Sequence, residues 1–172
     1  CNAWVASRSA GGSSGGAAVA LALRLLPVAD GSDFMGSLRN PAAWNHVFGL
    51  RPAQGRVPMW PAPEVWVSQL GTEGPMARTV TDLARLLQIQ AGFDPRTPLS
   101  IATTDQFALG CGDNFSKSAP QPRIGWLGDL GGYLATEPGV LAVCEAALSR
   151  LQAAGCAVEP AAPGFSPTAV WD

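Results

Sequence analysis

The spacing of apolar and polar residues divides the first part of the chain into a helix and a strand. Residues 17–26 are almost entirely alanine, valine and leucine, and Pro27 cannot continue a helix, so we expect a buried helix that ends there. Ser13 or Ser14 precedes it and is a residue type that caps helices. Residues 26–33 begin apolar and become small and polar, which predicts a short buried strand running into a loop.

A second helix is predicted over residues 79–91. Thr79 and Asp82 have the spacing of a capping box, apolar residues recur at helical intervals, and Gly92 follows the last of them. The residues between the two predicted helices are mixed. They comprise a candidate strand at 47–50, a turn at 52–55 and an ordered loop near a pocket at 58–67, which is rich in proline and tryptophan.

The last third of the chain has the pattern of a βαβ unit. Residues 123–127 and 157–159 are typical of strands, and residues 137–154 of a helix with Pro138 in its first turn. Such a unit predicts a parallel pair of strands. Residues 94–118 have no strong pattern and are expected to form a loop.

Composition and charge exclude several classes of function. The net charge is −2 without a basic run, so no nucleic-acid-binding surface is expected. The longest apolar stretch, residues 17–28, contains Arg24 and is too short to span a membrane. The four cysteines have neither the spacing of a zinc site nor the density of a disulfide scaffold, which indicates reduced core thiols of a cytoplasmic protein without a metal or cofactor.

Two serine-containing turns carry the candidate chemistry. The first is GGSSGG at residues 11–16, and the second is DFMGSLRNPAA at residues 33–43, which places Ser37 24 positions after Ser13. A serine hydroxyl needs a neighbouring base and donors for the oxyanion that forms when it attacks a carbonyl group. His46 is the only histidine and lies in an apolar stretch, so we expect it to be structural, and a Ser-His-Asp triad has little support.

These turns, together with GLRPAQGRVP at residues 49–58, resemble the sequence motif of the amidase signature family. Residues 74–83 resemble the family more loosely. The resemblance implies an α/β fold, a mixed β-sheet core flanked by helices. It also implies that residues 1–172 are the central part of a single amidase signature domain, with the signature motif at 11–58. The chain opens at Cys1 without an initiator methionine, and we expect an upstream, lysine-bearing part and a C-terminal part to be absent.

The resemblance further assigns roles to residues of both turns. Ser37 would attack the amide carbon, and Ser13, held by a cis peptide bond after Gly12, would pass the proton on to a neutral lysine. The oxyanion would be bound by main-chain N–H groups, and the turn would be supported by nearby side chains. The residues expected in these two groups are Phe34, Met35, Gly36 and Ser37 for the oxyanion, and Gly12, Ser14, Asp33 and Arg39 for support.

The chain departs from the family pattern at three points. The only lysine, Lys117, lies far downstream of the first turn, so the chain alone cannot complete the relay and is predicted to be inactive. Phe34 and Met35 stand where relatives often have smaller residues, and a side chain at Met35 would restrict the backbone. Asn45 stands where many relatives have a cysteine.

Several alternatives remain open at this point. The leading hypothesis is a hydrolase of linear carboxamides or aryl amides; the others are the amidase subunit of a tRNA-dependent amidotransferase and a catalytically dead binding module. The expected partner is a small-molecule amide, with no nucleic acid and no membrane, and a homodimer is left open. Ser37 could instead be an ordinary turn serine, and Ser13 a helix cap; Trp60 and Trp66 could be core or pocket wall.

Overall fold

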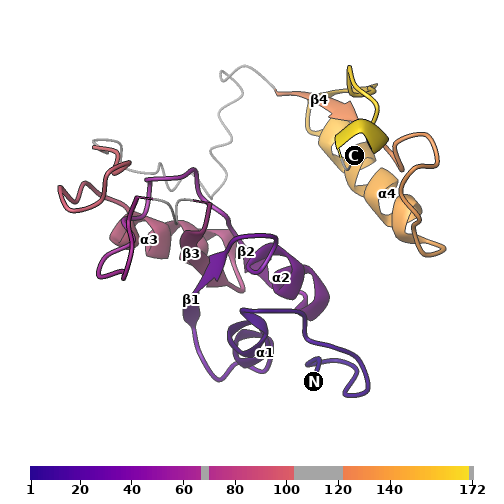
Figure 1. Ribbon diagram of the computed structural model, residues 1–172. Helices are drawn as coiled ribbons and strands as arrows, with labels where there is room; N and C mark the ends of the chain where they lie inside the picture. The colour runs from indigo at the N-terminus through magenta and orange to yellow at the C-terminus, as the bar shows by residue number, and fades with distance from the viewer. Residues whose placement is uncertain (67–69, 103–121, 171–172) are drawn as a thin grey trace. The chain divides into compact units, whose positions relative to one another are not determined.

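The computed structural model describes residues 1–66, 70–102 and 122–170 (Figure 1). The chain divides into two compact units, Cys1–Phe115 and Ser116–Asp172, each of which is described by itself. That both belong to one domain stays a prediction.

The first unit is built on a three-stranded antiparallel sheet in the order β1-β3-β2. The strands are β1 (Val28–Asp33), β2 (Phe48–Gly49) and β3 (Thr72–Ala77). Ala77 pairs with Val28 on one side and with Phe48 on the other, and Thr72 pairs with Asp33. The predicted strands at 26–33 and 47–50 are thereby confirmed.

The central strand β3 was not predicted. It contains Gly74 and Pro75, which both weaken a strand pattern, because proline lacks the N–H that a central strand donates. Pro75 still contributes its carbonyl oxygen, which accepts a hydrogen bond from Leu50 N–H over 3.1 Å. Burial of the strand between its two neighbours therefore outweighs its weak local propensity.

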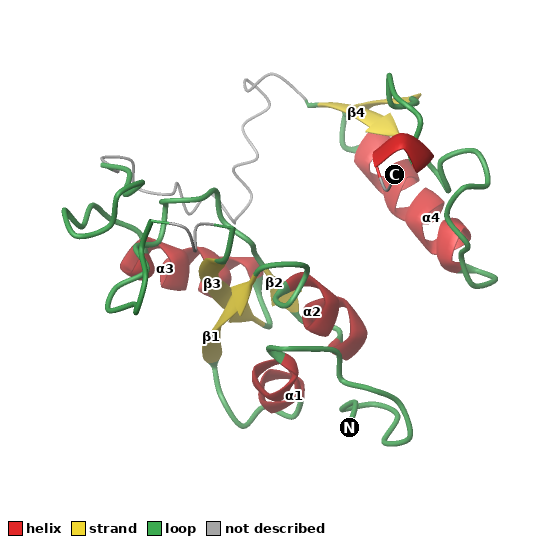
Figure 2. Ribbon diagram, viewed as in Figure 1, coloured by secondary structure: helices red, strands yellow, loops and turns green. Residues whose placement is uncertain are grey.

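Two helices pack on this sheet and on each other: α1 (Gly15–Ala22) and α2 (Arg39–Asn45). Figure 2 shows both helices beside the strands. They form the core with β3. Its buried apolar residues are Ala18, Leu21, Leu38, Ala42 and Met76.

Helix α1 ends four residues earlier than predicted. Arg24 has a left-handed backbone with φ 61°, and its N–H donates to Leu21 O over 3.0 Å. The N–H of Leu25 donates to Ala20 O over 2.8 Å, which completes a Schellman termination. The helix therefore closes on its own carbonyl groups before it reaches Pro27.

Helix α3 (Val80–Gln90) agrees with the prediction for residues 79–91. Thr79 Oγ1 accepts a hydrogen bond from Asp82 N–H over 3.1 Å, as the capping pattern indicates. Leu83 and Leu87 are buried on one face of the helix, which packs against β3.

The second unit contains β4 (Arg123–Trp126), α4 (Val140–Ala153), β5 (Ala157–Pro160) and the short 3₁₀ helix η1 (Thr168–Val170). The strands are parallel, with Arg123 opposite Ala157, which confirms the βαβ prediction. Helix α4 starts later than predicted because Gly139, at its N-cap, has a φ of 91° that no helical residue adopts. With one antiparallel and one parallel sheet, the fold class is α/β, as predicted.

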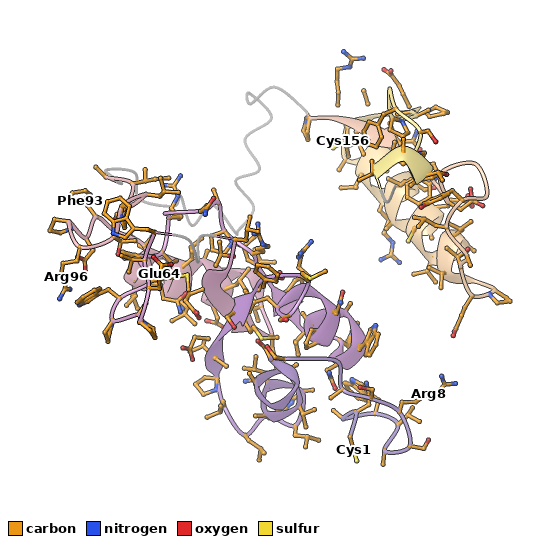
Figure 3. All side chains as sticks on the ribbon, in the orientation of Figure 1. Cys1, Arg8, Glu64, Phe93, Arg96 and Cys156 are labelled. Atoms are coloured by element: carbon orange, nitrogen blue, oxygen red, sulfur yellow. The ribbon has the colours of Figure 1, made fainter. Side chains whose placement is uncertain are left out.

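Three other predictions need correction or completion. Cys156 is buried, but Cys1 is exposed on the N-terminal loop, so it is not a core residue (Figure 3). Trp60 and Trp66 are exposed rather than core. Cys111 lies outside the described residues.

No helix among the described residues is both long and apolar enough to cross a membrane.

Candidate active site

The two serine turns lie against each other. Ser14 N–H donates a hydrogen bond to Ser37 O over 3.3 Å, although the residues are 23 positions apart in the sequence. The Gly12–Ser13 peptide bond is cis, as the resemblance implied. Ser13 is exposed and Ser37 is half-buried. The fold thus brings the two turns that carry Ser13 and Ser37 side by side.

Ser14 has a different role from the one expected of a capping residue. It stands at the N-cap of α1, where its carbonyl oxygen accepts from Ala18 N–H over 3.1 Å, but its side chain does not cap the helix. The Ser14 hydroxyl donates instead to Ser32 O over 3.4 Å. Ser14 therefore ties the first turn to the end of β1, which leads to Ser37.

Asp33 organises the turn that carries Ser37. Its carboxylate is fully buried and accepts hydrogen bonds from Gly36 N–H over 2.7 Å and from Leu38 N–H over 3.2 Å. Arg39 N–H adds a third main-chain contact at 3.4 Å. These bonds wrap residues 34–38 around one carboxylate, which holds Ser37 at a fixed place between them.

Arg39 also neutralises this buried carboxylate. Its Nε lies 2.9 Å from Asp33 Oδ2 and its Nη2 lies 3.1 Å from Oδ1, a bidentate pairing. The hydrogen bonds from Arg39 hold the pKa of the Asp33 carboxyl well below its usual range, and the pair raises the pKa of Arg39. The Arg39 side chain is 57% exposed, so the Arg39–Asp33 ion pair is buried only at its carboxylate end.

The expected oxyanion donors fall into two groups. Gly36 N–H is engaged by Asp33, whereas the N–H groups of Phe34, Met35 and Ser37 donate no hydrogen bond within the described part of the chain. Gly36 has a φ of 105°, and a Cβ there would lie 2.8 Å from Asn40 Nδ2, so only glycine fits. Gly36 thus shapes the turn, while the other three residues have N–H groups available.

The backbone at Met35 is ordinary. Among the described residues, the non-glycine residues with positive φ are Arg24, His46 and Leu130. Met35 is not one of them, so its Cβ does not strain the turn. The side chains of Phe34 and Met35 are 56% and 78% exposed.

The structure adds two residues that the sequence did not identify. Arg51 Nε donates to Asp33 O over 3.4 Å and lies 3.5 Å from Asp33 Oδ1, and Thr72 Oγ1 donates to the same Asp33 O over 3.4 Å. Arg51 stands within the GLRP segment that carried the resemblance, which was a usable signal. Thr72 had none, because the strand on which it lies was not predicted.

His46 makes none of the contacts that join the two turns. His46 ends α2 in a left-handed conformation and makes an edge contact with Trp4 at 6.4 Å between ring centroids, which agrees with its predicted structural role. Lys117 lies outside the described residues. Asn45 is buried and donates to Ala10 O over 2.8 Å, so it anchors the segment before the first turn.

The sequence is similar to curated proteins that are about three times as long. One is the A subunit of the glutamyl-tRNA(Gln) amidotransferase of Deinococcus radiodurans, with 41% identity over 158 residues, covering 91% of this chain and 31% of the relative. A relative of the same name from Pseudomonas savastanoi pv. phaseolicola is 51% identical over 100 residues, covering 58% of this chain and 20% of the relative. The chain spans about a third or less of the length of these proteins.

Solved structures resemble the chain in fold as well as in sequence. A bacterial aryl acylamidase of the amidase signature family matches with a TM-score of 0.84 and 31% identity, covering 99% of this chain and 34% of that one. The A subunit of the Thermotoga maritima glutamyl-tRNA(Gln) amidotransferase matches with a TM-score of 0.79 and 30% identity, covering 94% and 34%. The Amidase family model matches residues 1–170. With nearly its whole length matched by this model, the chain belongs to the amidase family.

Proposed function

We propose that this chain carries the nucleophile, Ser37, and the relay serine, Ser13, of an enzyme that hydrolyses carboxylic amide bonds. The observation that carries the proposal is the 3.3 Å hydrogen bond from Ser14 N–H to Ser37 O, which sets the two turns side by side. A nucleophile and its proton carrier must lie within hydrogen-bonding reach of each other. The contact between Ser14 and Ser37 supports that arrangement, because Ser14 is the residue directly after Ser13.

The reaction proceeds in two halves. In the first, Ser37 Oγ attacks the amide carbon while its proton passes to Ser13 and from there to a neutral lysine. The tetrahedral intermediate collapses, the C–N bond breaks, and the amine leaves with the proton returned through the same relay. In the second half, water gives a proton to the relay and attacks the acyl ester on Ser37. The acyl C–O bond breaks, Ser37 Oγ takes a proton back from the relay, and the carboxylic acid is released.

Main-chain N–H groups would stabilise the charge that develops on the carbonyl oxygen. Phe34, Met35 and Ser37 have N–H groups without a hydrogen-bond acceptor in the described part of the chain, and they belong to the turn that carries the nucleophile. A well-placed donor of this kind is worth about 3 kcal/mol in the transition state. Asp33, braced by Arg39, keeps this turn in shape.

The lysine of the relay must come from another part of the protein. Lys117 is the only lysine in the sequence, and the curated relatives are about three times as long as this chain. We infer that a longer protein supplies the base upstream of residue 1, and that the 172 residues alone do not hydrolyse amides.

A second candidate function is that of the A component of a tRNA-dependent amidotransferase. The curated relatives described above have this name, and one of them is 41% identical across 91% of the chain. In that role the same serines would release ammonia for transfer to an acylated tRNA within a complex. The catalytically dead module is less well supported, because the ordinary φ of Met35 removes the backbone objection to an active turn.

An active-site probe tests the proposal. In the full-length protein, a fluorophosphonate should label the wild type and fail to label Ser37→Ala, because phosphonylation needs the activated hydroxyl. Ser149→Ala, at an exposed serine on α4, is the matched control and should label normally. Equal labelling of the wild type and Ser37→Ala would remove Ser37 as the nucleophile.

Substrate choice separates the two candidate functions. A free-standing hydrolase should cleave a simple aryl amide without other proteins. A component of an amidotransferase should instead release ammonia from an amide donor such as glutamine, at a rate that rises when the other components of the complex are added.

A further inference from the structure

Two side chains, one from β3 and one from the segment after β2, donate hydrogen bonds to the carbonyl group of Asp33. Arg51, two residues after β2, donates from Nε over 3.4 Å, and Thr72, the first residue of β3, donates from Oγ1 over 3.4 Å. Asp33 itself is the last residue of β1. Strand β3 and the segment that follows β2 therefore each contribute a side-chain donor to one carbonyl group at the end of β1, where the turn that carries Ser37 begins.

The Asp33 carbonyl and the Phe34 N–H belong to the same peptide group. The cis bonds among the described residues are Gly12–Ser13 and Trp60–Pro61, so this peptide is trans. In a planar trans peptide the C=O and N–H bonds point in opposite directions. Donors that fix the direction of the carbonyl group therefore also fix the direction of the Phe34 N–H.

The Phe34 N–H is one of the free donors of the turn. It makes no hydrogen bond within the described part of the chain, whereas the carbonyl end of its peptide has two side-chain donors and belongs to a residue that pairs with Thr72 in the β1–β3 ladder. A peptide held firmly at one end and open at the other has the arrangement that a preorganised oxyanion donor requires. The guanidinium charge of Arg51 also polarises the peptide, which strengthens the N–H as a donor.

Arg51 is itself anchored at two further points. Its Nη2 donates to Leu70 O over 2.9 Å, and its Nε lies 3.5 Å from Asp33 Oδ1. Its side chain is 32% exposed, about half as much as that of Arg39. Arg39 contacts the Asp33 carboxylate and not the Asp33 carbonyl group, whereas Arg51 donates to the carbonyl group and also lies close to the carboxylate.

We propose that Arg51 and Thr72 are positioning residues for catalysis: they orient the Asp33–Phe34 peptide so that the Phe34 N–H is aimed at the oxyanion formed on the substrate. This inference rests on the proposed amide-hydrolase function. It predicts an effect on the transition state and not on the binding of the uncharged amide, because the charge appears on the oxygen only during the reaction.

Thr72 gives the cleaner test, because valine has nearly the same shape and lacks the hydroxyl. In the full-length enzyme, Thr72→Val should lower kcat about tenfold and change KM by less than about threefold, a part of the 10²-fold or greater loss that follows removal of a whole oxyanion donor. Thr72→Ser keeps the donor and should retain kcat within about twofold. Arg51→Ala should lower kcat further, and Arg85→Ala, at an exposed arginine on α3, should not change it.

A transition-state analogue provides a second readout. A trifluoromethyl ketone adds reversibly to the Ser37 hydroxyl and places an oxyanion in the proposed site. Its affinity should fall in Thr72→Val by about the same factor as kcat/KM, because both report the stability of the tetrahedral state.

The outcomes separate this inference from the function on which it rests. Unchanged kcat in Thr72→Val, or an equal loss of kcat in Thr72→Ser and Thr72→Val, would overturn the positioning role while Ser37→Ala remained inactive. Should Ser37→Ala keep full amidase activity, the proposed function and this inference would fall together. If Arg51→Ala does not fold, the two Thr72 variants decide the question.

Discussion

The side chain of Ser14 lies directly against the main chain of Gly31. A Cβ atom on Gly31 would lie 2.9 Å from Ser14 Cβ, closer still to the Ser14 hydroxyl, and 3.0 Å from Leu38 Cδ2. Carbon atoms do not approach each other so closely, so the first turn reaches its place only because residue 31 has no side chain. Strand β1 thus sets the position of Ser13 relative to Ser37.

Gly31→Ala should therefore lower kcat/KM at least tenfold in the full-length enzyme. The added methyl group must displace Ser14, and with it the Ser13 hydroxyl, and a shift of about 1 Å at a reacting group can cost up to 10²-fold in rate. Steady-state kinetics with an aryl amide, together with a thermal melt to show that the variant folds, measure the effect.

Gly16 provides the matched glycine control. It lies in α1, two residues after Ser14, and a Cβ there has no atom within 4 Å. Gly16→Ala should leave kcat/KM unchanged and increase stability by about 0.5–1 kcal/mol, because alanine favours a helix over glycine. Equal losses of kcat/KM in Gly31→Ala and Gly16→Ala would show that contact with Ser14 does not cause the loss in Gly31→Ala.

Asp33 should make stability depend on pH in the acidic range. Its folded-state pKa lies well below the unfolded value of about 3.9, chiefly because of the hydrogen bonds from Arg39. The ionised carboxylate therefore stabilises the fold fully above pH 5, and this contribution declines as the pH falls through about 4, where the unfolded chain begins to bind the proton.

Asp33→Asn should remove this contribution, at a cost of about 3 kcal/mol at pH 7, because the buried charge that pairs with Arg39 is lost and one of the two acceptor oxygens becomes an NH2 donor. Urea denaturation of both proteins from pH 7 to pH 3 measures the difference, which should shrink below pH 4. A difference of constant size across this range would mean that the charge of Asp33 is not what stabilises the turn.

Thr79 caps helix α3, and we expect its substitution to lower the stability of the protein without changing kcat. Thr79→Ala removes the acceptor for Asp82 N–H and should cost about 1 kcal/mol in the free energy of unfolding. Thr79→Ser retains the hydroxyl and should cost much less. Denaturant melts measure both, and a loss of kcat in Thr79→Ala at temperatures where it remains folded would contradict a purely structural role.

Local patterns were sufficient for the elements that have strong signals of their own. Helix α3 has a capping pair and a regular apolar face, and β4, α4 and β5 have turn residues between them. Strand β3 was missed because Gly74 and Pro75 hide its pattern, and it forms because it is buried between β1 and β2. Such a strand depends on its neighbours, which a local pattern does not include.

The candidate site, too, was predicted only as far as local patterns reach. The pairing of the Ser13 and Ser37 turns followed from two motifs that lie in one resemblance, but which main-chain N–H groups are free did not. Gly36 N–H is taken by Asp33, a contact that depends on the three-dimensional path of the turn. Thr72 reaches the Asp33 carbonyl only because β3 lies beside β1, so no local pattern could predict its role.

Met35 distinguishes an active enzyme from a dead binding module. Its side chain is 78% exposed, and its φ lies outside the left-handed region, so the turn does not need a glycine at this position. If the turn is competent as it stands, Met35→Gly should leave kcat within about threefold, because the N–H that would bind the oxyanion is present in both proteins.

The KM for an amide with a large apolar acyl group should rise in Met35→Gly, since an exposed apolar side chain next to the oxyanion site is lost. Kinetics with a short and a long acyl amide measure both effects. An inactive wild type that gains amidase activity through Met35→Gly would show instead that the methionine blocks the site.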